Sequence, residues 1–146
     1  MNTSTPLGRV MLIDDEAFDQ RMYRRIIERS GLASDVIGFT LATDAVAYLQ
    51  NDEMPLVDLI LLDIRMPKMD GFEFLDAAQQ YLGNEYETPV VMMLTTSLSP
   101  EDRAKADASE AIKGFLSKPL TAKHLESFVG LLEDAQKGLK PRPTEL

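Results

Sequence analysis

The stretch Leu59-Ile60-Leu61-Leu62-Asp63 decides the fold of this chain. Four consecutive apolar residues predict a short strand that is buried on both faces, as in a parallel sheet covered by helices. Because this is the most apolar run of the chain, we expect it at the centre of the sheet. A polar residue at the carboxyl end of such a strand lies where open α/β sheets bind ligands. Asp63 is therefore the first candidate for a functional residue.

Two further segments end at the same predicted edge of the sheet. The run Val10-Met11-Leu12-Ile13 is followed by Asp14 and Asp15, and the run Gly114-Phe115-Leu116-Ser117 is followed by Lys118. Clustered carboxylates repel one another unless a cation holds them. The three aspartates therefore predict a divalent metal site with one carboxylate free to do chemistry.

Short apolar runs alternate with amphipathic stretches along the chain. We predict strands at 9–13, 35–39, 57–62, 90–94 and 112–117, and helices at 17–30, 44–50, 72–81, 101–108 and 122–137. Five consecutive strand–helix units predict an α/β fold, a doubly wound parallel sheet with helices on both faces and right-handed crossovers.

Local signals mark several helix boundaries. Gly31 is expected to end the first helix, Thr43 to cap the second, and Ser99, followed by Pro100, to cap the fourth. The apolar stripe of the first helix is predicted from four side chains: Phe18, Met22, Ile26 and Ile27.

The domain organisation is expected to be simple. The chain of 146 residues predicts one domain at residues 9–137. We expect residues 1–8 to be a flexible N-terminus and the proline-rich residues 138–146 to be a disordered tail.

Composition excludes several classes of protein. The chain has no cysteine, which excludes disulfides and thiolate metal sites, and it has one histidine, which excludes a multi-histidine metal site. A formal net charge of -9 disfavours binding to nucleic acid or to an anionic membrane. No apolar run approaches the roughly 20 residues that span a bilayer, and the N-terminus does not resemble a secretory signal. We expect a soluble, cytoplasmic protein.

The candidate residues together suit phosphoryl transfer. Mg²⁺ takes oxygen ligands and keeps several waters, so two or three carboxylates with backbone carbonyls suit it. Lys118 can supply further positive charge to an incoming phosphoryl group, and Thr95, which ends the fourth apolar run, can offer a hydroxyl. An ionised aspartate is a competent nucleophile for this reaction, and Asp63 is the preferred candidate.

The same residues resemble a known family. Ile13-Asp14-Asp15, Asp63 with Pro67 and Gly71 four and eight residues later, Leu94-Thr95-Thr96 and Lys118-Pro119 together resemble the receiver domain of two-component response regulators. The resemblance runs from about residue 9 to 135 and looks most like stand-alone receivers. It implies a flavodoxin-like (βα)5 fold with strand order 2-1-3-4-5.

The resemblance also implies roles for single residues. Asp63 would accept a phosphoryl group from a phosphohistidine on a sensor histidine kinase or a histidine phosphotransfer protein. Asp15, Asp63 and the backbone carbonyl of Arg65 would ligate Mg²⁺, with Asp14 acting mainly through a bound water. Lys118 would contact the phosphoryl group.

The remaining implied roles concern the response to phosphorylation. The hydroxyl of Thr95 would move toward the phosphoryl group, and the ring of Phe115 would then turn inward. Two residues depart from the commonest receiver pattern, because Phe115 stands where many receivers have tyrosine and Thr96 where alanine is commoner. The side chain of Arg65 is a further variable, since it could overhang the phosphoryl group.

Several alternatives stay open at this point. Asp14 and Asp15 could simply cap the first helix, and the arginines of that helix could form either a solvated face or a docking surface. The leading hypothesis is a phosphorylation-controlled signalling switch that is not an enzyme and acts on a downstream protein as a monomer or homodimer. The competing hypotheses are a phosphate-independent receiver-like binding module and an Mg²⁺-dependent phosphohydrolase of the haloacid dehalogenase type. The hydrolase would need a second aspartate where Arg65 stands.

Overall fold

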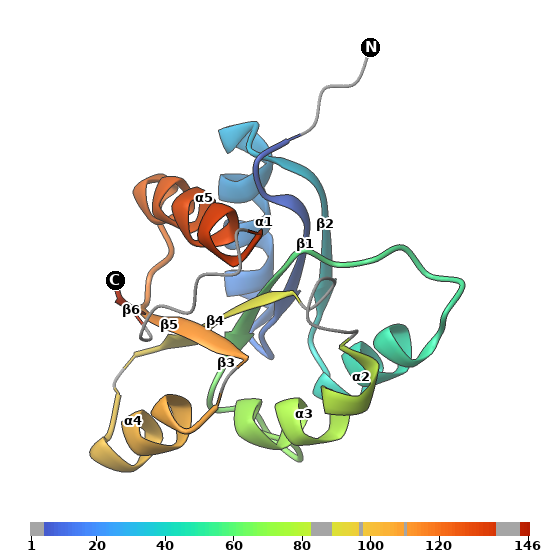
Figure 1. Cartoon of the computed structure of the whole chain (residues 1–146), viewed down its shortest axis with the longest axis vertical. Coiled ribbons are helices and arrows are strands. Elements are labelled where there is room, and N and C mark those ends of the chain that lie inside the picture. Colours follow the sequence, from blue (N-terminus) through green and yellow to red (C-terminus); the bar gives the residue numbers. More distant parts are fainter. Residues whose placement is uncertain (1–4, 83–88, 97, 110, 137–143) are drawn as a thin grey trace.

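The fold is a single parallel sheet between two layers of helices (Figure 1). The structure is a computed structural model, and it describes residues 5–82, 89–96, 98–109, 111–136 and 144–146. The strands are β1 (Gly8–Ile13), β2 (Ala33–Phe39), β3 (Leu59–Asp63), β4 (Val90–Thr95), β5 (Ile112–Ser117) and β6 (Thr144–Glu145). The helices are α1 (Ala17–Ser30), α2 (Ala42–Gln50), α3 (Gly71–Ala78), α4 (Pro100–Asp107) and α5 (Ala122–Gln136), with a 3-10 turn at Gln79–Tyr81.

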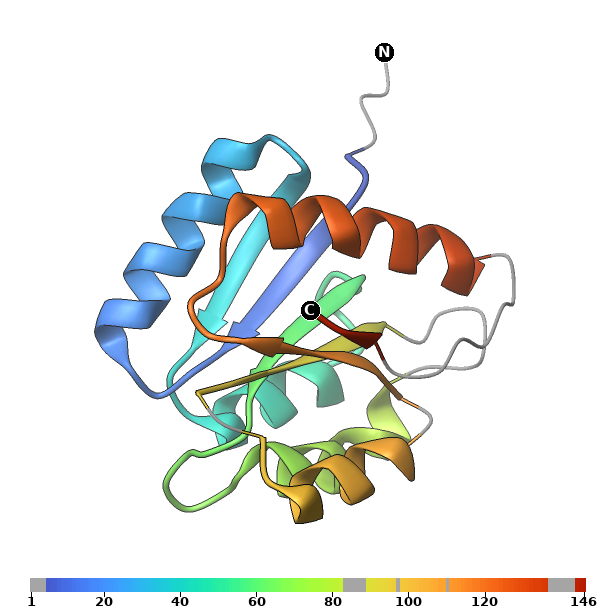
Figure 2. The same ribbon diagram turned by 90° about the vertical axis from the view of Figure 1, so that its left-hand side faces the viewer.

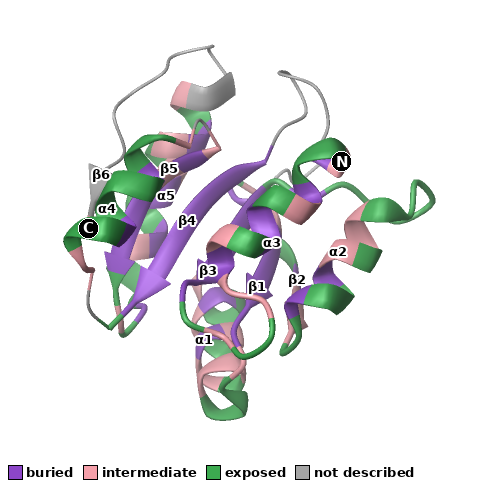
Figure 3. Ribbon diagram, turned by 90° about the horizontal axis from the view of Figure 1, so that it is seen from below, coloured by how far each residue is buried: buried purple, intermediate pink, exposed green. Residues whose placement is uncertain are grey.

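The strand order is β2-β1-β3-β4-β5-β6, which confirms the predicted order 2-1-3-4-5 and adds one strand. Each neighbouring pair is parallel. The strand β3 lies between β1 and β4, and all five of its residues are buried. Figure 3 shows this buried centre of the sheet. The apolar run that decides the fold is therefore central, as expected.

Two apolar clusters fill the space between the sheet and its helices. Alternate residues of β1 and β3 point to opposite faces, so Ile60 and Leu62 join one cluster while Leu59 and Leu61 join the other. The first cluster packs against α2, α3 and α4, and the second packs against α1 and α5. Figure 2 shows α1 and α5 on the same side of the sheet.

Helix boundaries follow local chemistry in most places. Gly31 ends α1 in the left-handed region at φ 71°, and Ser99 Oγ caps α4 by accepting a hydrogen bond from the backbone N–H of Asp102. The predicted cap at Thr43 is wrong, since α2 already begins at Ala42 and its N-cap residue Leu41 makes no side-chain cap. The predicted stripe of α1 is also wrong in one position, because the side chain of Phe18 is 63% exposed.

The structure describes ordered backbone on both sides of the expected domain at residues 9–137. Leu7 is fully buried and donates its N–H to the carbonyl of Leu32, and Gly8 begins β1, so ordered structure starts before residue 9. At the other end, residues 137–143 lie outside the described residues. Thr144–Glu145 form β6, and Leu146 donates its N–H to the carbonyl of Phe115, so the last three residues of the expected disordered tail are paired with β5.

Candidate functional site

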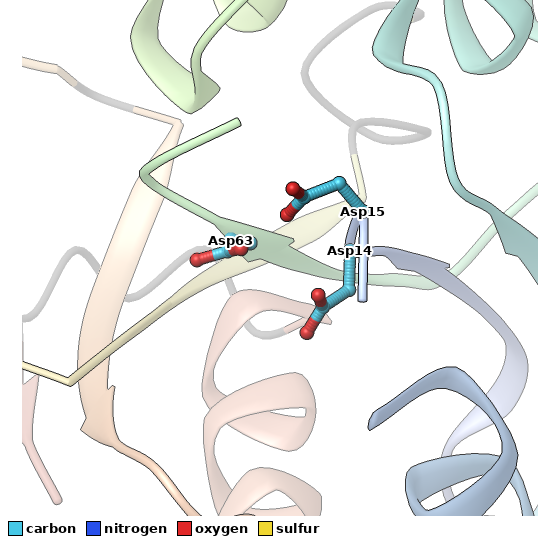
Figure 4. Close-up of side chains that lie close together, drawn as sticks. All are labelled: Asp14, Asp15 and Asp63. Carbon is cyan, nitrogen blue, oxygen red and sulfur yellow. The ribbon is translucent and has the colours of Figure 1, made fainter. Parts of the chain in front are cut away.

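Three carboxylates meet at the carboxyl edge of two neighbouring strands (Figure 4). Asp14 and Asp15 follow β1, and Asp63 ends β3. The pairing of Ile13 with Leu62 brings these strand ends to the same level. One oxygen from each of the three carboxylates lies within 4.8 Å of the other two, and Asp14 and Asp63 are buried. The structure thus brings together the three predicted acids.

Lys118 joins these acids from the loop after β5. Its Nζ lies 2.9 Å from Asp14 Oδ2, 3.1 Å from Asp19 Oδ2 and 3.6 Å from Asp63 Oδ2. The backbone N–H of Lys118 donates to the carbonyl of Thr95 at 2.8 Å, which ties the loop to the end of β4, and the peptide bond to Pro119 is cis. The ammonium group of Lys118 is therefore shared among the carboxylates of Asp14, Asp19 and Asp63.

The electrostatics of this cluster favour a cation. Burial, together with the charges of Asp14 and Asp15, raises the pKa of Asp63 to about 7, against the opposing charge of Lys118. Burial also raises the pKa of Asp14, against the hydrogen bond from Lys118. Burial alone would lower the pKa of Lys118, but the Asp14 hydrogen bond and the Asp63 charge raise it overall. The one positive charge of Lys118 does not balance the negative charges of the clustered aspartates. A divalent metal would supply the missing positive charge.

The loop after β3 is fixed by the start of α3. Asp70 and Glu73 form a capping box, with Asp70 Oδ1 accepting from the Glu73 N–H at 2.8 Å and Glu73 Oε1 accepting from the Asp70 N–H at 3.1 Å. The N–H of Gly71 donates to the carbonyl of Ile64 at 2.9 Å. Asp70 therefore shapes the turn and does not belong to the acid cluster.

The other predicted residues differ in their burial and in their side-chain contacts. Thr95 is buried at the end of β4, whereas Thr96 is exposed. Phe115 is also buried, so its ring is already turned inward, and the guanidinium carbon of Arg103 lies 5.6 Å from the ring centroid. The side chain of Arg65 binds Asp102 on α4, with Nη2 donating to Oδ2 at 2.6 Å.

Sequence reasoning missed two residues of α1 that contact the site. Asp19 binds Lys118, and Gln20 Nε2 donates to three backbone carbonyls at the ends of β1 and β2, those of Leu12, Asp14 and Phe39. Asp19 lies in the first turn of α1, where an acid is favoured in any case, so no local signal marks it as facing the site.

Comparison with known proteins identifies the family of this chain. Residues 10–129 match the family described as the response regulator receiver domain. The chain belongs to this family. The predicted receiver resemblance, the flavodoxin-like fold and the assignment to two-component signalling are thereby confirmed.

Solved structures of response regulators superimpose on this chain. A two-component response regulator from Cytophaga hutchinsonii superimposes with a TM-score of 0.76 at 27% identity, covering 88% of this receiver chain and 98% of that chain. The chemotaxis protein CheY4 of Vibrio cholerae gives a TM-score of 0.69 at 28% identity, covering 86% and 98% of the two chains.

Similar sequences include both short and long proteins. The response regulator Rcp1 of Synechocystis is 29% identical over 89% of each chain. The sensor histidine kinase CheAY of Helicobacter pylori is 28% identical over 82% of this chain, which spans 14% of that kinase. The cyclic di-GMP phosphodiesterase response regulator RpfG of Xanthomonas campestris is 30% identical over 81% of this chain, which spans 30% of RpfG. Within the described residues of this receiver, no helix is long and apolar enough to span a bilayer.

Proposed function

We propose that this receiver domain is a phosphorylation-controlled signalling switch that accepts a phosphoryl group on Asp63 from a phosphohistidine. The observation that carries the proposal is the convergence of the three carboxylates within 4.8 Å, with the Lys118 ammonium 3.6 Å from Asp63. A sensor histidine kinase or a histidine phosphotransfer protein would be the donor.

The chemistry of the donor set fits Mg²⁺. Asp15, Asp63 and the backbone carbonyl of Arg65 would hold the ion, with Asp14 acting mainly through a bound water. When bound, Mg²⁺ supplies charge neutralisation for the phosphoryl oxygens and holds Asp63 in its ionised form.

The group transfer itself is a displacement at phosphorus. An Oδ of Asp63 forms a new bond to phosphorus, the phosphorus–nitrogen bond of the phosphohistidine breaks, and the imidazole nitrogen leaves with the electron pair. Lys118 would stabilise the developing negative charge, because its ammonium already lies between Asp14 and Asp63. The hydroxyl of Thr95 would bind a phosphoryl oxygen.

The protein would signal through contacts with other proteins. Phosphorylation changes the charge at the carboxyl edge of the sheet, and Thr95 would carry the change to the surface of α4, β5 and α5. The ring of Phe115 is buried already, so its inward turn is not part of this proposal. A downstream protein would recognise that surface, with the receiver as monomer or homodimer. We propose a cytoplasmic location and no turnover of a separate substrate.

Intact mass after incubation with acetyl phosphate tests the proposal. The wild type is expected to gain one phosphoryl group with Mg²⁺ and none without it, whereas Asp63→Asn gains none. Asp44→Asn, a matched change at an exposed position of α2, is expected to behave as the wild type. No gain in the wild type, with Mg²⁺ binding confirmed by calorimetry, would favour a phosphate-independent binding module.

A further inference from the structure

The side chain of Arg65 connects the loop after Asp63 to the first turn of α4. Its Nη2 atom lies 2.6 Å from Asp102 Oδ2. The two partners differ in exposure, since the Arg65 side chain is 64% exposed and that of Asp102 is 3% exposed. An exposed guanidinium group therefore neutralises a buried carboxylate.

The two residues of this ion pair differ in how much each loses when the pair breaks. An exposed arginine loses little when it changes partner, because water and other anions solvate it. A buried carboxylate without a partner is strongly unfavourable, and it must either regain a partner or reach water. Removal of Arg65 would therefore act mainly on the segment that carries Asp102.

Few other buried side chains anchor that segment. In α4 only Asp102 and Ala106 are buried. The neighbouring Arg103 lies over the ring of Phe115, with 5.6 Å between its guanidinium carbon and the ring centroid. The first turn of α4 thus contacts both the loop that follows the phosphoryl acceptor and the aromatic side chain of β5.

We propose that Arg65 senses the phosphoryl group on Asp63 by exchanging Asp102 for the phosphoryl oxygens, and that the exchange releases α4. This inference rests on the proposed function. Arg65 is two residues from Asp63, and a phosphoryl dianion offers more charge and better geometry for a guanidinium group than one carboxylate does. Once Arg65 has moved, Asp102 reaches water only if the first turn of α4 shifts, and Arg103 then moves relative to Phe115.

Hydrogen exchange of the α4 amides tests this proposal on the whole chain. Beryllofluoride with Mg²⁺ serves as the phosphoryl mimic, and its occupancy is followed by fluorine NMR. In the wild type, bound beryllofluoride is expected to speed exchange of the Glu101–Asp107 amides by about tenfold. In Arg65→Gln, which leaves the Asp102 carboxylate without its partner, these amides exchange fast before addition. In Asp102→Asn, which removes the buried charge, they exchange as slowly as in the resting wild type. Both variants are expected to respond to beryllofluoride by less than about twofold.

A matched control removes an ion pair elsewhere. Arg9 Nε lies 3.1 Å from Asp35 Oδ2, on β1 and β2. Arg9→Gln is expected to leave both the resting exchange of α4 and its response as in the wild type. Circular dichroism establishes that each variant is folded. If a variant does not fold, the wild-type measurement is by itself sufficient to overturn the proposal.

The outcomes separate the inference from the proposed function. Bound beryllofluoride with unchanged α4 exchange in the wild type would overturn the inference and leave the phosphoryl acceptor intact. A normal α4 response in Arg65→Gln would also overturn it. No bound fluorine signal in the wild type would overturn the proposed function, and the inference with it.

Discussion

Gly71 approaches Asp63 so closely that a Cβ atom at position 71 would lie 2.7 Å from the backbone oxygen of Asp63. The Met93 methyl group at 3.1 Å can move aside, but the Asp63 oxygen and the Ile64 Cα at 3.2 Å belong to the backbone and cannot yield without a shift of the chain. The first turn of α3 is thus packed directly on the residue that we propose as phosphoryl acceptor.

Gly71→Ala is therefore expected to lower the free energy of unfolding by about 1–3 kcal/mol and to slow phosphorylation by acetyl phosphate, since the Asp63 backbone must shift. Urea unfolding and intact mass measure the two effects. Gly130→Ala in α5 is the control, because a Cβ there meets nothing within 4 Å. The packing argument fails if the two variants are equally stable.

Asp63→Asn is expected to stabilise the metal-free protein at pH 8. The pKa of Asp63 is raised by burial and neighbouring acids from 3.8 to about 7. Between pH 3.8 and about 7, the folded state therefore holds a proton on Asp63 that the unfolded state lacks. The free energy of unfolding falls as the pH rises through this range. The substitution should raise the free energy of unfolding by about 4 kcal/mol at pH 8. Thermal unfolding at pH 8 and at pH 3.5 measures the gain, which should nearly vanish at the lower pH; an equal gain at both values would contradict the argument.

The affinity for Mg²⁺ is expected to depend on pH for the same reason. Below pH 7 the ion must displace a proton from Asp63, so the affinity should rise about tenfold per pH unit up to that value and level off above it. Isothermal titration calorimetry at pH 5.5, 6.5, 7.5 and 8.5 provides the measurement, with proton release as an independent readout. A constant affinity over this range would exclude Asp63 as the titrating ligand.

Asp19→Asn is expected to weaken Mg²⁺ binding more than the removal of another negative charge from the same segment. Asp19 holds the Lys118 ammonium on the α1 side, at 3.1 Å. Without this partner, Lys118 would move toward Asp63 and compete with the metal. We expect a loss of affinity of about threefold to tenfold. Glu16→Gln, an exposed acid in the same segment, is the control for charge alone; equal losses in the two variants would show that contact with Lys118 is unimportant.

The sequence predicted the centre of the fold and of the site for one physical reason. The apolar runs that precede Asp14, Asp63 and Lys118 are strands, and the carboxyl ends of parallel strands meet at one edge. The run before Asp63 contains only apolar residues, so its burial and its central place followed directly. Gly71 was part of the family pattern, and the structure supplies its reason as a close approach to the backbone of Asp63.

Contacts that depend on side-chain direction across the fold were not predictable. Asp19 and Asp102 look like ordinary first-turn acids of α1 and α4, which helix dipoles favour anyway. Nothing local reveals that Lys118 reaches the first and Arg65 the second. Local signals also misled, because Thr43 has a good capping side chain but lies inside α2, and Phe18 continues an apolar stripe but is exposed.

The ion pair between Lys118 and Asp14 joins positions 104 residues apart. Such a contact between residues far apart in the sequence contributes to a high contact order. It forms only after strands from both ends of the chain have paired in the sheet. A chain still emerging from the ribosome without β5 would therefore carry its acids without their lysine. A ligand that needs this lysine and these acids together recognises only the finished sheet. Such a ligand should slow unfolding and leave the rate of folding almost unchanged.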